Sequence, residues 1–141
     1  MSDTKKWYLI DAKDKTVGRI SILIAKLISG KHKATYISHL NSGDSVIVIN
    51  VEKVQITGKK FTKKKYRRHS GRPGGLKTET FEQLRRRISE RILEESVMGM
   101  LPKGSLGYAL IRNLKVYTGQ FHPHTSQKPI VLDKKNYGNK R

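Results

Sequence analysis

A continuous run of β-branched apolar residues, Val46–Ile49, constrains the fold more than any other feature of the chain. An uninterrupted apolar strand must be covered on both faces, which is typical of parallel sheets packed between other layers. Earlier in the chain, Trp7–Ile10 has the composition of a short buried strand, and apolar residues then recur at helical spacing across Ile20–Ile28. Strand, helix and buried strand form the βαβ pattern, which predicts an α/β fold with a parallel sheet.

Local signals predict the remaining elements. Gly30 ends the first helix, and Asp14 or Thr16 can cap its N-terminus. A short strand is expected at Val54–Thr57, after the buried strand. A later helix is expected to start with a Thr80–Gln83 capping box and to place Phe81, Leu84, Ile88 and Ile92 on one face, and Ser89 can cap its second part. After it we expect a helix at Leu106–Asn113 and a strand at Leu114–Tyr117. The tail over residues 119–141 is expected to be extended or disordered.

The composition changes sharply after the first three elements. From Lys53 to Thr78 the chain carries ten Lys and Arg residues and no acidic residue, and Gly58–Gly75 is rich in glycine and poor in large aliphatic residues. Such a segment has too little apolar surface to form core. We therefore expect residues 58–77 to form a long basic loop or arm. Lysine supplies point charges to phosphates, arginine supplies forked donors, and the rings of Tyr66 and His69 can stack on unpaired bases.

A surplus of positive charge extends over the whole chain. Its 141 residues, about one domain in length, include 30 Lys and Arg against 11 Asp and Glu, which gives a formal net charge of +19. On so small a body these charges repel one another unless a polyanion neutralises them, so nucleic acid is the leading partner. A membrane surface ranks second, because the densest basic run contains Gly and Pro instead of an amphipathic helix. The longest apolar stretch is too short to span a bilayer, and we expect no secretory signal.

Other chemistries find little support in the sequence. The absence of cysteine excludes disulfides, cysteine-based zinc sites and thiol catalysis. Neither a phosphate-binding loop nor a dinucleotide-type glycine motif is present, so we expect no cofactor and no small-molecule substrate. The His122-Pro123-His124 motif is weak evidence for a metal, and RNA contact or plain exposure explains it better. An Mg²⁺-dependent nuclease that uses Asp11, Asp44 and Glu52 is the enzymatic alternative, although Asp14 and Asp44 more simply cap or turn the backbone.

Several sequence blocks, taken in order, are specific to one family. The chain resembles the bacterial and plastid form of large-subunit ribosomal protein thirteen from Trp7 to about Pro129. The blocks are Trp7–Ala12, Val17–Arg19, Gly30–Lys33 with Tyr36, Gly43–Asp44 leading into Val46–Asn50, Thr57–Lys60, Tyr66–Gly75, Gly99–Gly104, Leu114–Tyr117 and His122–His124.

The chain also departs from the usual family pattern. Val17 stands where Leu is usual, Ser89 where Pro is common, and Met98 where Lys is common. Tyr108 replaces a usual Arg, which removes one cationic contact. The run Ser70–Gly75 looks most like cyanobacterial or plastid members.

The resemblance implies a fold, a function and a location. The fold is a three-layer α/β/α arrangement around a central, mainly parallel four-stranded sheet, and residues 1–141 form a single domain. The implied function is structural: binding large-subunit ribosomal RNA early in subunit assembly, as a monomer among neighbouring ribosomal proteins, without catalysis. The location is the ribosome of a bacterial cytoplasm or of an organelle such as the plastid. A free regulator that binds messenger RNA stays open as an alternative, since the same surface would serve both roles.

The expected RNA contacts combine the basic segments with the family blocks. For Arg19, exposure to solvent and contact with RNA are equally compatible with the sequence. The predicted RNA-binding residues are Lys31, His32, Lys33, Lys59, Lys60, Lys63, Lys64, Lys65, Tyr66, Arg67, Arg68, His69, Arg72, Lys77, Lys103, His122 and His124.

Overall fold

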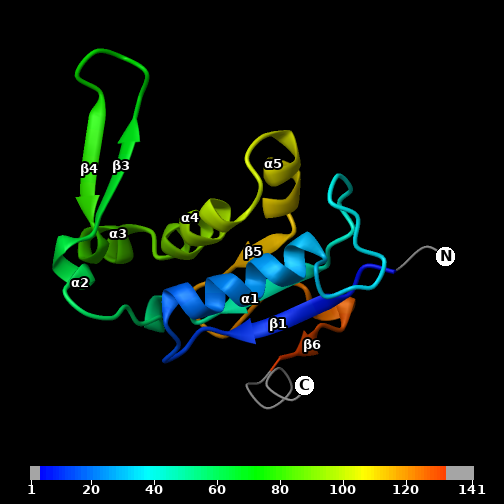
Figure 1. Ribbon diagram of the computed structural model, residues 1–141. Coiled ribbons are helices and arrows are strands. Elements are labelled where there is room, and N and C mark those ends of the chain that lie inside the picture. The colour runs from blue at the N-terminus through cyan, green and yellow to red at the C-terminus, as the bar shows by residue number, and fades with distance from the viewer. Residues whose placement is uncertain (1–3, 133–141) are drawn as a thin grey trace.

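The structure is a computed structural model and describes residues 4–132. It alternates helices and strands along the chain (Figure 1). The elements are β1 (Trp7–Asp11), α1 (Val17–Ser29), β2 (Ser45–Ile49), the 3₁₀ helix η1 (Val51–Lys53), α2 (Lys60–Lys63), β3 (Lys65–His69), β4 (Leu76–Thr80), α3 (Phe81–Arg87), α4 (Glu90–Met100), α5 (Ser105–Ile111), β5 (Leu114–Val116), the 3₁₀ helix η2 (Thr125–Gln127) and β6 (Ile130–Val131).

A four-stranded sheet with the order β5-β2-β1-β6 forms the centre of the molecule. All of its pairings are parallel, with Leu9 opposite Ile47 and Val48 opposite Val116. Helix α1 makes the crossover between β1 and β2, as the βαβ pattern predicted. These features confirm the α/β class and the parallel four-stranded sheet.

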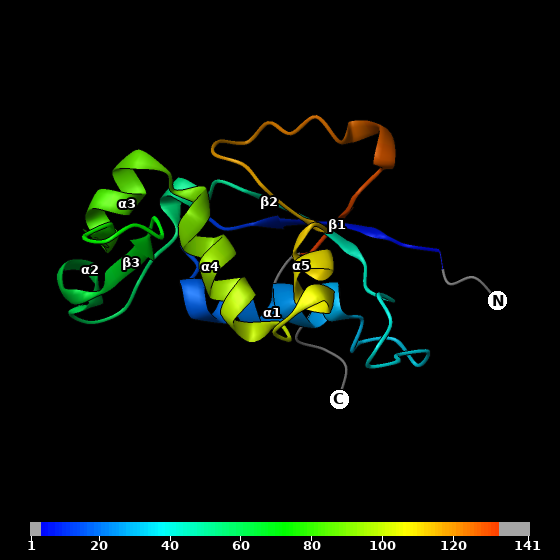
Figure 2. The same cartoon turned by 90° about the horizontal axis from the view of Figure 1, so that it is seen from above.

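The two faces of this sheet are covered differently. Helices α1, α4 and α5 lie on one face, where Ile24, Ile28, Val46, Val48 and Leu93 are buried in a common core. The opposite face carries the segment between β5 and β6, which includes η2 (Figure 2). Ile47 is also fully buried, so β2 is covered on both faces as expected. The third layer therefore consists of a loop and a 3₁₀ helix where an α-helical layer was expected.

Helix α1 follows its predicted boundaries closely. Gly30 ends it with a left-handed backbone (φ 80°), a conformation that glycine adopts without a steric penalty. Thr16 occupies the N-cap position, yet its side chain makes no capping hydrogen bond within the described residues. Asp14 does not cap the helix either: its backbone is left-handed (φ 57°), and its carboxylate accepts a hydrogen bond from Gln55 Nε2 at 3.4 Å.

The prediction of a strand at Val54–Thr57 is wrong. Asn50 turns the chain with a left-handed backbone (φ 56°), and η1 follows it. Val54 then buries its side chain, and Gln55 makes a single parallel bridge to Thr16. That bridge lies at the turn before α1, beyond the end of β1, so no neighbouring strand is available to extend the pairing.

The helix expected from Thr80 is divided in two. Ile88 has a non-helical backbone (φ −148°, ψ 89°), which separates α3 from α4. Ser89 precedes α4, but its side chain makes no capping hydrogen bond within the described residues. The capping box at α3 is confirmed: Thr80 Oγ1 accepts from Gln83 N, and Gln83 Oε1 accepts from Thr80 N at 3.0 Å.

Replacing Thr80 with alanine should lower the free energy of unfolding by about 1 kcal/mol, because the backbone N–H of Gln83 at the start of α3 loses its acceptor, Thr80 Oγ1. Chemical denaturation of the full chain measures this change. Thr78→Ala is the matched control, since Thr78 is exposed on the same strand and should change stability by less than about 0.5 kcal/mol. Equal losses in the two variants would contradict the capping role.

The described part of the tail joins the central sheet. Ile130 and Val131 form β6, which pairs with β1, and Leu132 N donates to Leu9 O at 2.9 Å. Of the two expectations for the tail, the extended one holds for the strand at Ile130–Val131 and the disordered one is wrong for residues 119–132, while residues 133–141 lie outside the described part. The missed signal is the short apolar run after Pro129, too brief to be distinguished from a loop. In residues 4–132, no helix is long and apolar enough to cross a membrane.

Candidate nucleic-acid interface

The basic segment forms an ordered arm. Residues 58–77 were expected as a long loop, but they form the short helix α2 and most of an antiparallel hairpin. Figure 1 shows this hairpin projecting away from the central sheet. The difference arises because five residue pairs, from Lys65 opposite Thr80 to His69 opposite Leu76, satisfy the backbone of both strands. A hairpin holds its side chains at defined positions, which a flexible loop does not.

The register of the hairpin places like charges opposite each other. Arg68 lies directly across from Lys77, and neighbouring Arg67 is exposed on the other face of the same strand. Like charges in directly opposed positions destabilise a strand pair. The nearest acidic residue on the hairpin, Glu79, is already bound to Arg87 at 2.7 Å, and this hydrogen bond lowers the pKa of its carboxyl. The charge of Glu79 acts on Arg68 as well, so the cations of the outer arm, defined here as residues 67–77, are neutralised only in small part.

The tip of the arm depends on its glycines. Gly71 and Gly74 have left-handed backbones (φ 85° and 70°), and Gly75 lies so close to Ser70 that a side chain would not fit. The turn keeps Arg72 exposed at the end of the arm. His69 Nδ1 accepts a hydrogen bond from Gly71 N at 2.9 Å, so a neutral ring carries its proton on Nε2.

A second, smaller core anchors the arm to the body. Phe81, Leu84 and Ile92 are buried with Val17 and Val54, and the side chains of Phe61 and Tyr66 pack against them. The rings of Phe61 and Phe81 lie 5.6 Å apart, within the range of a favourable aromatic pair. This cluster is separate from the core under the sheet. Residues 67–77 contribute no side chain to either core, so changes confined to them leave both cores intact.

Tyr66 belongs to that anchor, although the sequence suggested that its ring stacks on a base. The ring is half-buried against the second core, and Lys64 Nζ lies 5.0 Å from its centre. Its hydroxyl is buried and has no hydrogen-bond partner within the described residues. Burial, together with the charge of Glu95, raises the pKa of Tyr66 to about 12. The geometry favours packing over stacking for this residue.

Tyr66→Phe should raise the free energy of unfolding by about 1 kcal/mol at neutral pH, because it removes a buried hydroxyl that lacks a partner. The pH dependence has a definite sign. Between pH 10, where unfolded tyrosine ionises, and pH 12, the unfolded chain binds fewer protons than the folded one, so Tyr66 makes wild-type stability fall. The variant lacks this contribution, and urea unfolding across that pH range measures the difference. A variant less stable than wild type at neutral pH would contradict the assignment.

The basic patch after α1 is divided by a buried carboxylate. Asp44 is fully buried and pairs with His32 Nε2 and Lys33 Nζ, each at 2.8 Å. It also accepts a hydrogen bond from Lys6 N at 3.0 Å. Lys33 is only 9% exposed, so its charge is used within the protein, whereas Lys31 is exposed. The structure thus favours Lys31 over Lys33 and His32 for contact with RNA.

The histidines of the tail lie in a cluster of rings. His124 Nε2 is 2.7 Å from the Tyr117 hydroxyl, and its ring is 5.2 Å from that of Trp7. His122 stacks against His124 at 6.5 Å, and its Nδ1 accepts from the His124 backbone. Within residues 4–132 no group of three or more His, Cys, Asp or Glu residues is placed to hold a metal. Both histidines stay partly accessible, which leaves RNA contact as a prediction.

The three carboxylates named for the nuclease alternative, Asp11, Asp44 and Glu52, each make different interactions within the protein. Asp11 accepts from Asn50 Nδ2 and from Lys13 N, both at 2.9 Å. Burial tends to raise the pKa of Asp11, but these hydrogen bonds and the nearby lysines outweigh it and lower the pKa. Glu52 Oε2 accepts from Gly119 N at 3.0 Å, while Asp44 is bound in its own buried network. The three side chains do not form one site.

Most of the predicted cationic contacts are available on the surface. They come from the loop after α1, from the arm and from the turn before α5. The exposed members are Lys31, Lys59, Lys60, Lys63, Lys64, Lys65, Arg67, Arg68, Arg72, Lys77 and Lys103.

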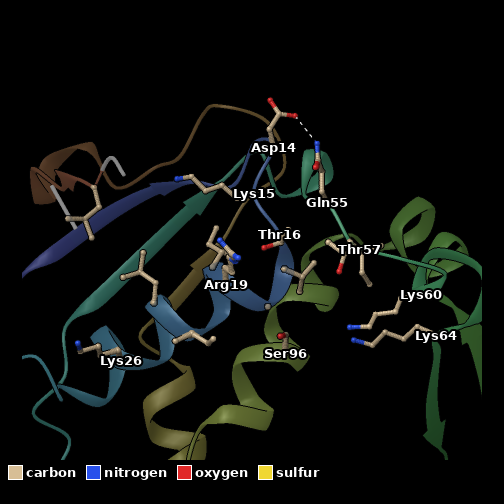
Figure 3. A pocket seen from close by; sticks show the side chains of 17 residues that line it. Asp14, Lys15, Thr16, Arg19, Lys26, Gln55, Thr57, Lys60, Lys64 and Ser96 are labelled. Carbon is tan, nitrogen blue, oxygen red and sulfur yellow. Dashed lines mark hydrogen bonds between the residues drawn. The ribbon is translucent and has the colours of Figure 1, made fainter. Parts of the chain in front are cut away.

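The fold also creates a basic cavity that the sequence did not reveal. A cavity of about 930 Å³ lies between α1 and the base of the arm. Figure 3 shows Lys60 and Lys64 extending side by side toward it, with Arg19 and Lys15 on the α1 side. Lys15 was missed and Arg19 was left open, because these residues and the arm lysines are about forty positions apart in sequence and only the tertiary fold brings them together.

Comparison with known proteins decides the family. The model of the ribosomal protein L13 family matches residues 5–123 of this chain. The chain belongs to the ribosomal protein L13 family. Among its relatives, large ribosomal subunit protein uL13 of Prochlorococcus marinus subsp. pastoris is 57% identical over 92% of this chain and 90% of the relative. The proteins of the same name from Acaryochloris marina and Trichormus variabilis are each 59% identical, over 91% and 92% of this chain, and each match covers 85% of the relative. The resemblance stated from the sequence blocks is confirmed.

Proposed function

We propose that this chain is a structural constituent of the large ribosomal subunit, that it binds large-subunit ribosomal RNA, and that it supports subunit assembly and translation. The observation that carries this proposal is the outer arm, where Arg67, Arg68 and Lys77 are held on a projecting hairpin whose one acid, Glu79, is bound to Arg87. The names of the family and of the relatives support the ribosomal setting.

Phosphate neutralisation is the physical basis of the proposed binding. Each cation that pairs with a phosphate releases a condensed counterion, and this release favours association. A-form RNA presents mainly its backbone and 2′-hydroxyls, so reading of base sequence is secondary. If about eight phosphates are neutralised, the logarithm of the affinity falls with the logarithm of the salt concentration with a slope of roughly −6.

The proposal includes the setting of the protein. The chain acts as a monomer within the ribosome, beside neighbouring large-subunit proteins, in a bacterial cytoplasm or in the stroma of a plastid. Relatives named from Prochlorococcus, Acaryochloris and Trichormus support a source close to these organisms.

Sedimentation tests the proposed function directly. In a gradient near 0.1 M salt, this chain should stay with purified large subunits at one copy per subunit, and raising the salt concentration should release it, because the proposed affinity comes from phosphate contacts. Quantitative protein analysis of the gradient fractions measures the ratio. Recovery of the chain mainly in the free fraction would refute the proposal.

A cleavage assay separates the proposal from the nuclease alternative. The protein should leave structured RNA uncut with or without Mg²⁺. Specific cleavage that is lost when Asp11 or Glu52 is replaced would instead favour the nuclease.

A further inference from the structure

The cavity beside the arm combines two kinds of surface. Its α1 wall contributes Ile22, whose side chain is 60% exposed, and Leu23, and Ile56 lines it from the segment leading to the arm. Cationic side chains surround this apolar floor, as Figure 3 shows for Arg19, Lys60 and Lys64. The volume of about 930 Å³ falls within the range of cavities that hold small organic ligands.

Apart from Lys15, whose charge acts on Asp11, the cations around the cavity have no acidic partner within residues 4–132. In residues 4–132, the side chains of Arg19 and Lys60 make neither a hydrogen bond nor an ion pair, and Lys64 contacts the ring of Tyr66 instead of an acid. Asp14 is the single carboxylate among the residues that line the cavity, against five cations. The five are Lys15, Arg19, Lys26, Lys60 and Lys64. A ligand that fits this arrangement is anionic and has an apolar part.

We infer that this cavity binds one unpaired nucleotide of the RNA, with its base on Ile22, Leu23 and Ile56 and its flanking phosphates near the cations. This inference rests on the proposed function and extends it to a defined site. A duplex backbone alone would leave the apolar floor unused, because paired bases stay inside the helix, whereas protein sites for single strands combine a basic groove with a surface for the base.

Two other occupants are less compatible with the charges. The chain's own residues 133–141 follow Leu132, which lines the cavity. They contain Lys134, Lys135, Lys140 and Arg141 against Asp133, so a basic segment would enter a basic cavity. An acidic protein segment would match the cations but not the apolar floor, and the experiment below separates it from RNA.

A single introduced thiol can report on the cavity, because the chain has no cysteine. In full-length Ile22→Cys, a short uridine oligonucleotide at about ten times its Kd should slow alkylation of the thiol about tenfold, because only about a tenth of the sites are then unoccupied. Val131→Cys is the matched control, since Val131 is 53% exposed on β6, does not line the cavity and should show little protection. An RNA duplex of the same length and polyglutamate should each protect position 22 much less. Equal protection by either of them, or none by the oligonucleotide, would overturn the inference.

A second pair of variants separates this inference from the proposed function. Ile22→Glu should weaken binding to protein-free large-subunit ribosomal RNA about tenfold, because it places a carboxylate on the floor of the cavity. Val131→Glu introduces the same charge at a similar exposure, on a strand that does not line the cavity at this position, and should bind much as wild type does. If the two variants bind equally tightly, the cavity inference fails while RNA binding by the arm stands. If wild type itself does not bind this RNA, the proposed function fails.

Discussion

Replacing Arg67, Arg68 and Lys77 together with glutamine should weaken binding to large-subunit ribosomal RNA roughly a hundredfold near 0.1 M salt. The slope of log affinity against log salt should also become shallower by about two units, since each lost phosphate contact removes about 0.7. The fold should survive, because all three side chains are exposed and both cores lie elsewhere. Stability should rise slightly, if at all, because Arg68 and Lys77 no longer repel each other across the hairpin.

A charge-matched control distinguishes the arm from net charge alone. Lys13, Arg112 and Lys128 are exposed outside the arm, and their replacement with glutamine removes the same total charge. Titration of both triple variants against the RNA over a range of salt concentrations gives the two affinities and the two slopes. The arm would lose its proposed role if both variants weakened binding equally, or if the arm variant kept wild-type affinity.

Asp44→Ala should lower the free energy of unfolding by about 3–5 kcal/mol. The aspartate is fully buried, and its removal leaves the largely buried Lys33 ammonium without its 2.8 Å partner. The Lys6 N–H also loses its acceptor, which weakens the attachment of the segment before β1. Urea unfolding of the full chain, followed by circular dichroism, measures the loss.

Two further variants make the Asp44 prediction specific. Asp14→Asn removes an exposed carboxylate and keeps a residue type that tolerates a left-handed backbone, so its effect should be below about 0.5 kcal/mol. Combining Asp44→Asn with Lys33→Met removes both charges and should cost less than Asp44→Ala, because no ammonium is then left without a counter-charge. A loss below about 1 kcal/mol for Asp44→Ala would show that the buried pair contributes little.

Local signals predicted much of the architecture. The apolar spacing of α1, the left-handed stop at Gly30 and the capping box at Thr80 each depend on neighbours within a few residues, and all three are present. The uninterrupted apolar run of β2 predicted burial on both faces, which also follows from local composition. Ser89 was expected to cap the second part of the next helix, and the helix does divide there, although the apolar spacing continues across Ile88 and the Ser89 side chain makes no capping hydrogen bond within the described residues.

The candidate site was predicted in its charge but not in its shape. Exposed cations of the arm, such as Arg67 and Arg68, could be recognised from the absence of nearby acids in the sequence. Lys33 could not be separated from Lys31, because its partner Asp44 is eleven residues away and becomes a neighbour only when the chain folds. Tyr66 was assigned to stacking because nothing in its sequence surroundings reveals the apolar cluster beneath it.

The sequence by itself determined the α/β class, the excess of positive charge and the family, because each is encoded in composition, short-range spacing or an ordered set of motifs. The tertiary structure decided which cations are free for RNA, that the arm is a hairpin, and that Arg19 and Lys60 share a cavity. These properties depend on distances between residues far apart in the chain. Such distances follow from how β-strands pair and side chains pack, and neither is visible in local spacing.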